Sequence, residues 1–422
     1  MIPEDPLAYL FSLERLGMKF GLENISALCG SLGHPECRFD SVIVAGTNGK
    51  GSVTAMVETA LRAAGHRTAR YTSPHLTRLE ERFVIDGTDV ATDTLRAAAV
   101  RVRNAIESLR GRGVLEEPPT FFEATTAVAF ELFRNASIEI AVLEVGLGGR
   151  LDATNVVTPV VAAITSIDFD HQAQLGSTIE AIAREKAGVI KEGVPVVCGP
   201  LPPAADHVIG GVCEERHARL VRARDDVGVT IHGSTVDFRS RRRALTGVHL
   251  SLAGRHQIDN AAVALSVLDV LDDRGMRVGD DAVREGLSRT VWPARLERFT
   301  IGSTEVLIDA AHNPAGARAL ASYLSDIGWT DVTLVFGAVQ DKDVAGMLEA
   351  LLPHARTIVC TTPPSPRAMA AGAVAAHAAT SGASVEIVVD PAAALTRACA
   401  LDTRVVVAGS IFLIGPLRDI LR

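Results

Sequence analysis

The sequence predicts an α/β protein with two domains, each built on a mostly parallel sheet. The chain has 422 residues, and a domain typically has ~100–200. Short runs that are apolar on both faces alternate with segments of helical periodicity, a pattern typical of parallel sheets covered by helices. Hydrophobic residues make up 47% and charged residues 22% of the chain, as in globular proteins rather than disordered ones.

The first series of strands and helices begins at residue 41. Residues 41–45 predict a buried strand, and a glycine-rich turn then leads into a helix over residues 50–64. Three further apolar runs predict buried strands of the same domain: residues 138–145, 160–164 and 194–198. Helical periodicity marks two intervening segments, residues 121–134 and 179–187. Between residues 227 and 252 the segments become short and alternating, which predicts a small antiparallel patch.

A second α/β series follows Trp292 and Pro293. Its predicted strands cover residues 306–309, 332–336, 357–360, 385–389 and 405–408. We place the domain boundary after residue 295, which gives domains over residues 1–295 and 296–422. No long Gly/Ser-rich linker separates them, so we expect the two domains to face each other across a cleft. The basic run at residues 239–243, RSRRR, is expected to be the solvated tip of a hairpin.

Charge and cysteine content exclude several classes of protein. There are 42 Lys and Arg against 50 Asp and Glu, a net charge of −8, so we expect no nucleic-acid partner. No apolar run reaches ~18 residues, so no membrane partner is expected. Acids at Glu4 and Asp5 stand where a signal peptide has its basic region, which favours a cytoplasmic location. We also expect the protein to be a monomer. Six cysteines without CxxC or zinc spacing predict separate thiols: Cys29, Cys37, Cys198, Cys213, Cys360 and Cys399.

The most informative segment is the turn at residues 46–52, GTNGKGS, between a predicted strand and a predicted helix. Glycines let consecutive N–H groups point at an anion, and the helix adds its positive end. Lys50 would reach the β- and γ-phosphates of a nucleotide, and the Ser52 hydroxyl could ligate Mg²⁺. The general GxxxxGK[ST] pattern is not satisfied, because Val44 and Gly51 occupy two of its positions. A purely structural glycine-rich turn therefore stays open as an alternative.

GTNGK followed by a small residue and then Ser or Thr resembles the phosphate loop of the Mur ligase superfamily. The full string GTNGKGS resembles the folate branch of that superfamily, the folylpolyglutamate synthase/dihydrofolate synthase family. Other motifs of that family follow in order from residue 13 to residue 410, so the resemblance covers nearly the whole chain. The N-terminal and central motifs are LER (13–15), KFGLENI (19–25), TSPHL (72–76), TFFEATT (120–126) and LEVGLGGRLDATN (143–155). The later motifs are DH (170–171), REKAG (184–188), HQ (256–257), NA (260–261), HNP (312–314), FGA (336–338) and DKD (341–343).

The resemblance implies an ATP-dependent amide ligase of folate biosynthesis and one-carbon metabolism. It would add L-glutamate to dihydropteroate and to folate (poly)glutamates through an acyl phosphate. The implied fold is an N-terminal P-loop-type parallel-sheet ATPase domain with a small antiparallel patch, followed by a C-terminal Rossmann-like α/β domain. The implied cofactors and substrates are ATP, Mg²⁺ as two ions, and the small molecules dihydropteroate, folates and L-glutamate.

The resemblance also assigns metal and catalytic roles. Ser52, Glu144 and His171 would hold Mg²⁺, and Glu144 ends an apolar strand, where a carboxylate faces the ligand crevice of a parallel sheet. Lys186 matches a lysine that is carbamylated in the family, although its position on a helix beside Glu185 alone favours an exposed ion pair. Lys50, Lys186 and His312 are the catalytic residues that the resemblance implies.

Nucleotide and substrate residues complete the implied site. The ATP site takes Thr47, Asn48, Gly49, Lys50, Gly51, Ser52, Asn260, Arg295, Asp309 and His312. The substrate site takes Ser73, Pro74, His75, Arg82, Thr120, Phe122, Asp152 and Ala153. Phe121 is expected to lie in the core. Two residues have structural roles as alternatives to a role in the site: Asn313 could cap a helix, and Arg295 could form an ion pair at the hinge. Ala294 and Ala310 replace glycines that are usual in the family, so we expect modest backbone changes there.

Three alternatives stay open. The chain could be a dedicated folylpolyglutamate synthase without activity on dihydropteroate. It could be another Mur-type amino-acid ligase, such as a peptidoglycan-precursor ligase, although no extra N-terminal nucleotide-sugar domain is evident. It could be a nucleotide-binding regulatory protein without catalysis. The presence together of four residues argues against this: Lys50, Glu144, His171 and Lys186.

Overall fold

The computed structural model of the protein describes residues 3–17, 19, 21–379 and 382–422. The sequence expectations that fall on Met1, Ile2 and Phe20 lie outside this described part. The chain forms two compact units. Unit 1 comprises Met1–Ile167, Leu175–Ser251 and Asp259–Thr290, and unit 2 comprises Asp168–Gln174, Leu252–Ile258 and Val291–Arg422. Two short segments of the first sequence series, 168–174 and 252–258, thus belong to unit 2.

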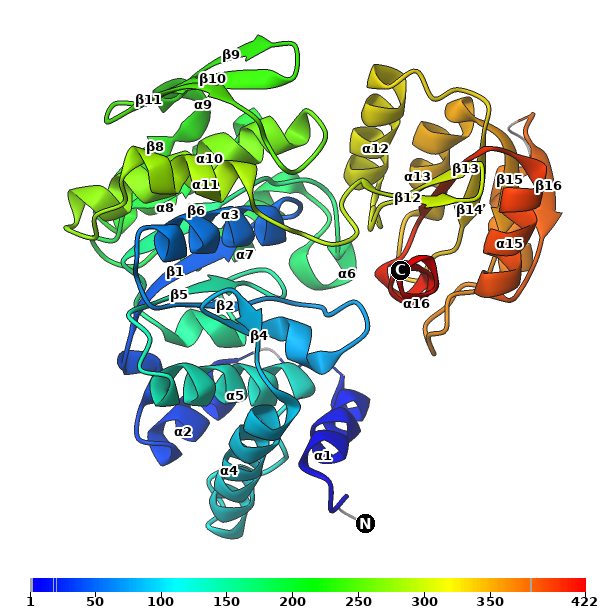
Figure 1. The fold of residues 1–422 in the computed structure, drawn as a ribbon. Helices are drawn as coiled ribbons and strands as arrows, with labels where there is room; N and C mark the ends of the chain where they lie inside the picture. Colours follow the sequence, from blue (N-terminus) through cyan, green and yellow to red (C-terminus); the bar gives the residue numbers. More distant parts are fainter. Residues whose placement is uncertain (1–2, 18, 20, 380–381) are drawn as a thin grey trace. The chain divides into compact units, whose positions relative to one another are not determined.

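Unit 1 is built on an eight-stranded sheet in the order β4-β3-β2-β5-β1-β6-β7-β8 (Figure 1). The six strands from β2 to β8 in this order are parallel, and β3 and β4 are antiparallel additions at one edge. The strands are β1 (Asp40–Ala45), β2 (Thr68–Tyr71), β3 (Phe83–Ile85), β4 (Thr88–Asp89), β5 (Ile140–Glu144), β6 (Val161–Ile164), β7 (Val196–Cys198) and β8 (Leu220–Arg222).

Helices cover this sheet because the apolar faces of helices and sheet are removed from water by packing against each other. One core cluster joins α1, α2, α4 and α5 to side chains of β2, β3 and β5. A second joins α7 and α8 to β1, β6 and β7. The helices of the unit are α1 (Pro6–Ser12), α2 (Glu23–Ser31), α3 (Lys50–Ala63), α4 (Thr92–Gly111), α5 (Phe121–Asn135), α7 (Ile179–Ala187), α8 (Pro203–Glu215), α9 (Ala223–Asp226), α10 (His256–Asp273) and α11 (Asp280–Ser288). The first three residues of α10 belong to unit 2.

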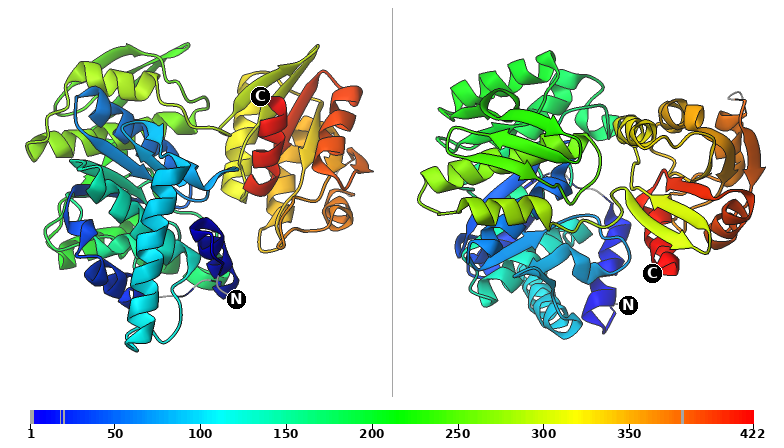
Figure 2. Two further views of the ribbon diagram at one scale, coloured as in Figure 1. Left: turned by 60° about the horizontal axis from the view of Figure 1, so that its bottom comes forward. Right: turned by 45° about the horizontal axis from the view of Figure 1, so that its top comes forward.

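The predicted antiparallel patch is confirmed as a three-stranded sheet beside α10 (Figure 2). It consists of β9 (Gly228–His232), β10 (Thr235–Arg239) and β11 (Ala244–Val248). The basic run lies in the β10–β11 turn, as expected, but the expectation that it is solvated is wrong for Arg243. The Arg243 side chain is 2% exposed and pairs with Asp269 at 2.6 Å and Asp272 at 2.7 Å. These acids on α10 hold the hairpin against the helix.

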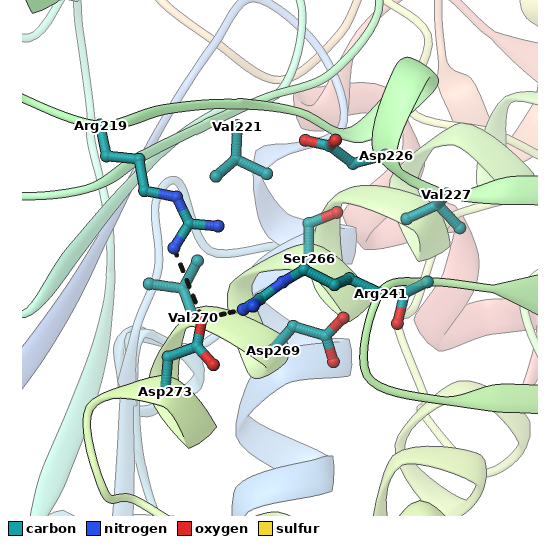
Figure 3. Close-up of a pocket in the computed structure, with 10 residues that line it drawn as sticks. Arg219, Val221, Asp226, Val227, Arg241, Ser266, Asp269, Val270 and Asp273 are labelled. Carbon is teal, nitrogen blue, oxygen red and sulfur yellow. Dashed lines mark hydrogen bonds and ion pairs between the residues drawn. The ribbon is translucent and has the colours of Figure 1, made fainter.

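A small pocket lies at the same place and is lined by ion pairs (Figure 3). Asp273 accepts from both Arg219 and Arg241 across its wall. Asp269 and Asp273 lie nine or more residues along α10 from Asn260, about 14–20 Å at the rise of an α-helix. The side chains of this pocket already neutralise one another, so it is a structural feature of the hairpin.

Unit 2 contains a six-stranded sheet in the order β12-β13-β17-β14-β15-β16, in which only β12 is antiparallel. Its strands are β12 (Glu297–Ile301), β13 (Thr304–Ile308), β14 (Val332–Phe336), β15 (Ala355–Cys360), β16 (Ser384–Ile387) and β17 (Arg404–Ala408). Its helices are α12 (Pro314–Asp326), α13 (Val344–Leu351), α14 (Ala371–Ala378), α15 (Pro391–Leu401) and α16 (Ile411–Leu421). The predicted fold class of both units is therefore confirmed.

The sequence missed strands that are short or half-exposed. β2 contains the charged Arg70, and β12 has no buried residue, so neither shows the apolar run that marks a central strand. No helix of the described residues is long and apolar enough to cross a membrane.

Candidate active site

The predicted phosphate loop connects β1 to α3 in a conformation that requires glycine. Gly46 and Gly49 have φ values of 148° and 83°, and a Cβ on Gly49 would overlap the side-chain oxygen of Asn260. The loop is fastened to the end of β6: Thr47 N–H donates to the Ser166 carbonyl at 2.8 Å, and Asn48 N–H to the Ser166 hydroxyl at 3.0 Å. The structure thus brings Asn260 to the loop, as the resemblance implied.

Two lysines from different elements meet at this loop. Lys50, the first residue of α3, donates through Nζ to the carbonyl oxygens of Gly46 and Thr47, both at 3.1 Å. Lys186 Nζ, from α7, donates to the same Gly46 oxygen at 2.9 Å and is 4% exposed. The solvent-facing ion pair that position alone favoured for Lys186 is therefore wrong, since its neighbour Glu185 pairs with Arg150 instead.

Oxygen donors lie at the same edge of the sheet. Glu144 is the last residue of β5, is buried, and stands opposite Val44 in the parallel register with β1. Its Oε2 accepts from the Ser73 backbone N–H at 3.3 Å. Ser52 is buried in the first turn of α3. A carboxylate and a hydroxyl are the hard oxygen ligands that Mg²⁺ prefers, so these two residues fit the predicted ion.

Hydrogen bonds between its own side chains stabilise the predicted substrate loop, residues 72–82. Arg82 Nε donates to His75 Nδ1 at 2.9 Å, and the Arg82 guanidinium lies 5.1 Å from the centre of the Phe121 ring. Burial, followed by the charge of Arg82, lowers the pKa of His75 to about 4, so this imidazole is neutral at pH 7. Ser73 and Pro74 are joined by a cis peptide bond.

Aromatic rings gather next to this loop. The Phe122 ring lies 5.9 Å from that of Tyr71 and against Gly146, where a Cβ would overlap it. Phe121 is buried and stacks on Phe11 at 5.6 Å, which confirms its expected place in the core. Phe122 is only partly buried, so its ring is the one available to a flat ligand.

Three other predicted substrate residues already have structural roles. Thr120 is the N-cap of α5, and its hydroxyl and N–H exchange hydrogen bonds with Glu123 in a capping box. Asp152 accepts from the backbone N–H groups of Leu147 and Thr154 at 2.9 and 3.0 Å. Burial raises the pKa of the Asp152 carboxyl against these bonds. Ala153 is buried beside it. Their substrate roles stay predictions.

Unit 2 gathers a separate set of polar groups around Asp170. Lys342 Nζ lies 2.6 Å from Asp170 Oδ1 and 3.3 Å from His171 Nε2. Asn313 Nδ2 donates to Asp170 Oδ2 at 3.0 Å. Burial raises the pKa of Asp170, but the charges of Lys342 and the two nearby histidines outweigh it and hold that pKa well below its usual range. In this arrangement His171 faces an ammonium group, and its metal role stays a prediction.

His312 and Asn313 directly precede α12. His312 Nδ1 lies 2.9 Å from the Ala310 carbonyl, and burial, followed by the charge of Lys342, lowers its pKa to about 4. Asn313 is the N-cap of α12, because its Oδ1 accepts from Gly316 N–H at 2.8 Å. The helix-cap alternative for Asn313 is thus confirmed.

Arg295 precedes β12 and Asp309 follows β13, so both lie at the same end of this antiparallel pair of strands. Asp309 accepts from the N–H groups of Leu296 and Ala311 at 2.9 and 2.8 Å, and burial, opposed by Arg295, raises its pKa. Ala294 and Leu296, on both sides of Arg295, have φ values of 58° and 49°. Two residues in the left-handed region hold the Arg295 backbone in a sharp turn.

Asp170 and Lys342 lie in motifs that carry the family resemblance, but no role was predicted for either residue. Thr165 and Ser166 were missed altogether, although both hydroxyls donate to Asn48 and so shape the phosphate loop. Their only sequence signal was two hydroxyl residues directly after a predicted strand, which is too common to single out a site.

Two family models match the chain. Residues 44–197 match the Mur ligase middle domain, and residues 294–411 match the Mur ligase glutamate ligase domain. The chain is 34% identical over 374 residues to a dihydrofolate synthase/folylpolyglutamate synthase of Bacillus subtilis, and the matched region covers 86% of each chain. It is 33% identical over 425 residues to the folylpolyglutamate synthase of Lacticaseibacillus casei, covering 99% of this chain and 98% of that one.

Solved structures agree with these relatives. An Escherichia coli FolC in complex with DHPP and ADP superposes with a TM-score of 0.89 at 30% identity, over 100% of this chain and 98% of that one. A bifunctional folylpolyglutamate synthase/dihydrofolate synthase with Mn, AMPPNP and L-glutamate bound gives 0.88 at 32% identity, over 100% of both chains.

The two units and the loop between β1 and α3 define a Mur-type ligase, an ATP-dependent enzyme. Within that class, the chain belongs to the folylpolyglutamate synthase/dihydrofolate synthase family. The peptidoglycan-ligase and regulatory-protein alternatives are thereby set aside.

Proposed function

We propose that the protein joins L-glutamate both to dihydropteroate and to folate (poly)glutamates, using ATP and an acyl phosphate intermediate. The observation that carries the proposal is the meeting of Lys50 and Lys186 at the phosphate loop, next to the buried Glu144. The names of the Bacillus subtilis relative and of the solved bifunctional enzyme support it.

The chemistry needs activation because a carboxylate is a poor acyl donor. A carboxylate oxygen of the pteroate or folate attacks the γ-phosphorus of ATP, and ADP leaves. The amine of glutamate then attacks the acyl carbon, the C–O bond to phosphate breaks, and inorganic phosphate leaves with that carboxylate oxygen. The nitrogen loses a proton as the amide forms. Positioning and charge neutralisation supply most of the rate enhancement in such phosphoryl transfer.

The residues of the phosphate loop and of the predicted metal site take the roles that this chemistry requires. Lys50 and the N–H groups at the start of α3 would bind the β- and γ-phosphates. Ser52, Glu144 and His171 would hold two Mg²⁺ ions, which neutralise charge on the phosphates when bound. A carbamate on Lys186 would supply a further oxygen ligand. Burial of Lys186 within reach of the loop supports this assignment.

The remaining roles follow the resemblance. Asn260 lies against Gly49 and would contact the nucleotide. Arg295, Asp309 and His312 of unit 2 would contribute to the nucleotide site. The partly buried ring of Phe122 would stack on the pterin, with Ser73, Pro74, His75, Arg82, Thr120, Asp152 and Ala153 lining the substrate site.

A dedicated folylpolyglutamate synthase is the second candidate. Two observations favour it: the Lacticaseibacillus casei relative, which covers nearly the whole chain, carries only that name, and the Thr120 hydroxyl is already engaged by the capping box. The two candidates share one activation chemistry and differ in which carboxylate reaches the γ-phosphate.

An isotope experiment tests the activation chemistry. A folate or dihydropteroate substrate labelled with ¹⁸O in its reacting carboxylate is turned over with ATP and L-glutamate. The expected result is one ¹⁸O atom in each inorganic phosphate released. Unlabelled phosphate, with amide product formed, would contradict the acyl phosphate route.

A further inference from the structure

A mixed group of potential metal ligands lies in the turn between α2 and β1. The short helix η2 (Pro35–Cys37) follows His34, and the side chains of His34, Glu36 and Cys37 converge there. His34 Nδ1 lies 2.8 Å and Cys37 Sγ 3.7 Å from Glu36 Oε1. One ligand atom from each residue lies within 4.8 Å of the other two, and the part of the chain that the structure describes holds no other such group.

The carboxylate at the centre of this group is buried and incompletely partnered. The Glu36 side chain is 7% exposed, and its Oε2 is buried without a hydrogen-bond partner. A cation bound through Oε1, the oxygen that faces His34 and Cys37, would place positive charge beside this buried carboxylate.

The chemistry of the three ligands selects the class of metal. One imidazole nitrogen, one carboxylate oxygen and one thiolate sulfur suit Zn²⁺ and similar borderline ions, not Mg²⁺ or Ca²⁺. With tetrahedral bonds of ~2.0–2.3 Å, ligand atoms lie ~3.3–3.7 Å apart. The sulfur–oxygen separation already has this value. The nitrogen–oxygen pair must open by roughly half an ångström, which His34 can do because its side chain is 64% exposed.

We propose that His34, Glu36 and Cys37 bind a zinc-class divalent cation, with water in the fourth position. Cys37 would bind as a thiolate and release its proton to solvent on binding. This site stands apart from the proposed ligase chemistry. It precedes β1, whereas the phosphate loop follows β1, and a strand of six residues separates the two by about 20 Å.

Its effect would therefore be structural. The turn already connects α2 to β1, and Arg134 of α5 donates to the Leu32 carbonyl at 2.6 Å within it. An ion bound by the folded turn and not by the unfolded chain stabilises the native state in proportion to its affinity. The proposal does not depend on which folate substrate the enzyme uses.

Cobalt substitution tests the site directly. Protein stripped with a chelator and kept free of nucleotide is titrated with Co²⁺, and the absorption spectrum is recorded. We expect a thiolate-to-cobalt charge-transfer band that saturates at one equivalent and disappears when Zn²⁺ is added. Cys37→Ser should abolish the band, and His34→Ala should weaken binding at least tenfold. The matched control Cys399→Ser, a partly exposed thiol of unit 2, should behave as wild type.

A second measurement covers the case in which a variant folds poorly. Alkylation of the exposed Cys37 thiol in wild-type protein, followed by peptide mass spectrometry, should slow at least tenfold with Zn²⁺ and recover with chelator, while that of Cys399 should not change. Absence of a thiolate band, a band that persists in Cys37→Ser, or alkylation of Cys37 that Zn²⁺ does not slow would overturn the proposal.

Discussion

The ammonium groups of Lys50 and Lys186 donate to one backbone atom, the carbonyl oxygen of Gly46, at 3.1 and 2.9 Å. Two positive charges that share one neutral acceptor repel each other at short range. The pair is held by the fold rather than by mutual attraction, since Lys50 begins α3 and Lys186 lies on α7. A carbamate on Lys186 would replace this like-charge pair with an opposite-charge pair.

Lys186 should be needed as a carbamate and not as a cation. We expect Lys186→Ala to lose at least ~10²-fold in kcat, by analogy with other charge-stabilising groups, and small carboxylates to restore part of it. Lys186→Arg, which keeps the charge, should stay inactive. ¹³C NMR of metal-loaded enzyme under ¹³CO₂ should show one carbamate signal that is missing in Lys186→Ala. Full activity in carbon-dioxide-free buffer would contradict this role.

Phe122 should matter more for dihydropteroate than for folate extension. Loss of a stacking contact worth about 0.5–1.5 kcal/mol should reduce kcat/KM for dihydropteroate roughly 2- to 10-fold in Phe122→Ala. The longer folate substrates place a different carboxylate at the phosphate, so their pterin need not occupy the same position. Phe39→Ala, which removes a ring packed on Phe130 and Phe133, serves as the control. Equal losses for both substrates in Phe122→Ala would contradict the idea that the pterin of dihydropteroate and the pterin of longer folates bind in different positions.

Stability should fall as the pH drops from about 6.5 to about 4, in part because of His75. Its pKa is about 4 in the folded protein and 6.5 ordinarily, so between these values the unfolded chain binds a proton that the folded chain does not. Protonation of this residue in the unfolded chain therefore lowers the free energy of unfolding as pH falls, by about 2 kcal/mol between pH 7 and 4.5. Denaturant unfolding of His75→Gln should show a shallower pH dependence, whereas the exposed His207→Gln on α8 should keep the wild-type slope. An unchanged slope in His75→Gln would be the contrary result.

Ala294 should be improved by glycine. Its φ of 58° lies in the left-handed region, which costs a residue with a Cβ ~1–2 kcal/mol, while glycine adds only a smaller entropic cost. We expect Ala294→Gly to raise the free energy of unfolding by about 0.5–1 kcal/mol. Ala310→Gly, which is not among the left-handed positions, should lower it by about 1 kcal/mol. Destabilisation in both variants would show that the turn at Ala294 does not carry this strain.

The sequence was sufficient where local signals and tertiary structure agree. The strand over residues 41–45, the glycine turn and the helix from Lys50 were predictable because an apolar run, the needed glycines and helical periodicity stand next to one another. β12 was not predictable, since its burial is low and its pairing with β13 is what makes it a strand.

Contacts between segments that are distant in the sequence could not be predicted from local patterns either. Arg243 looked solvated because the three aspartates that bury it lie 26 to 37 residues further along the chain. Lys342 and Asp170, 172 residues apart, form an ion pair that no local pattern encodes. The group of His34, Glu36 and Cys37 was missed because its spacing matches no common zinc motif.

Formation of dihydrofolate from dihydropteroate, L-glutamate and ATP tests the central claim most directly. Product is followed by mass spectrometry with purified wild-type protein, Lys50→Ala and Arg289→Ala, the last removing a cation that is 75% exposed as a control. We predict product that requires both ATP and glutamate, a loss of ~10³-fold or more in Lys50→Ala, and wild-type rates in Arg289→Ala. No dihydrofolate from the wild type, with folate extension intact, would leave a dedicated polyglutamate synthase. Near-normal turnover in Lys50→Ala would contradict the phosphate loop itself.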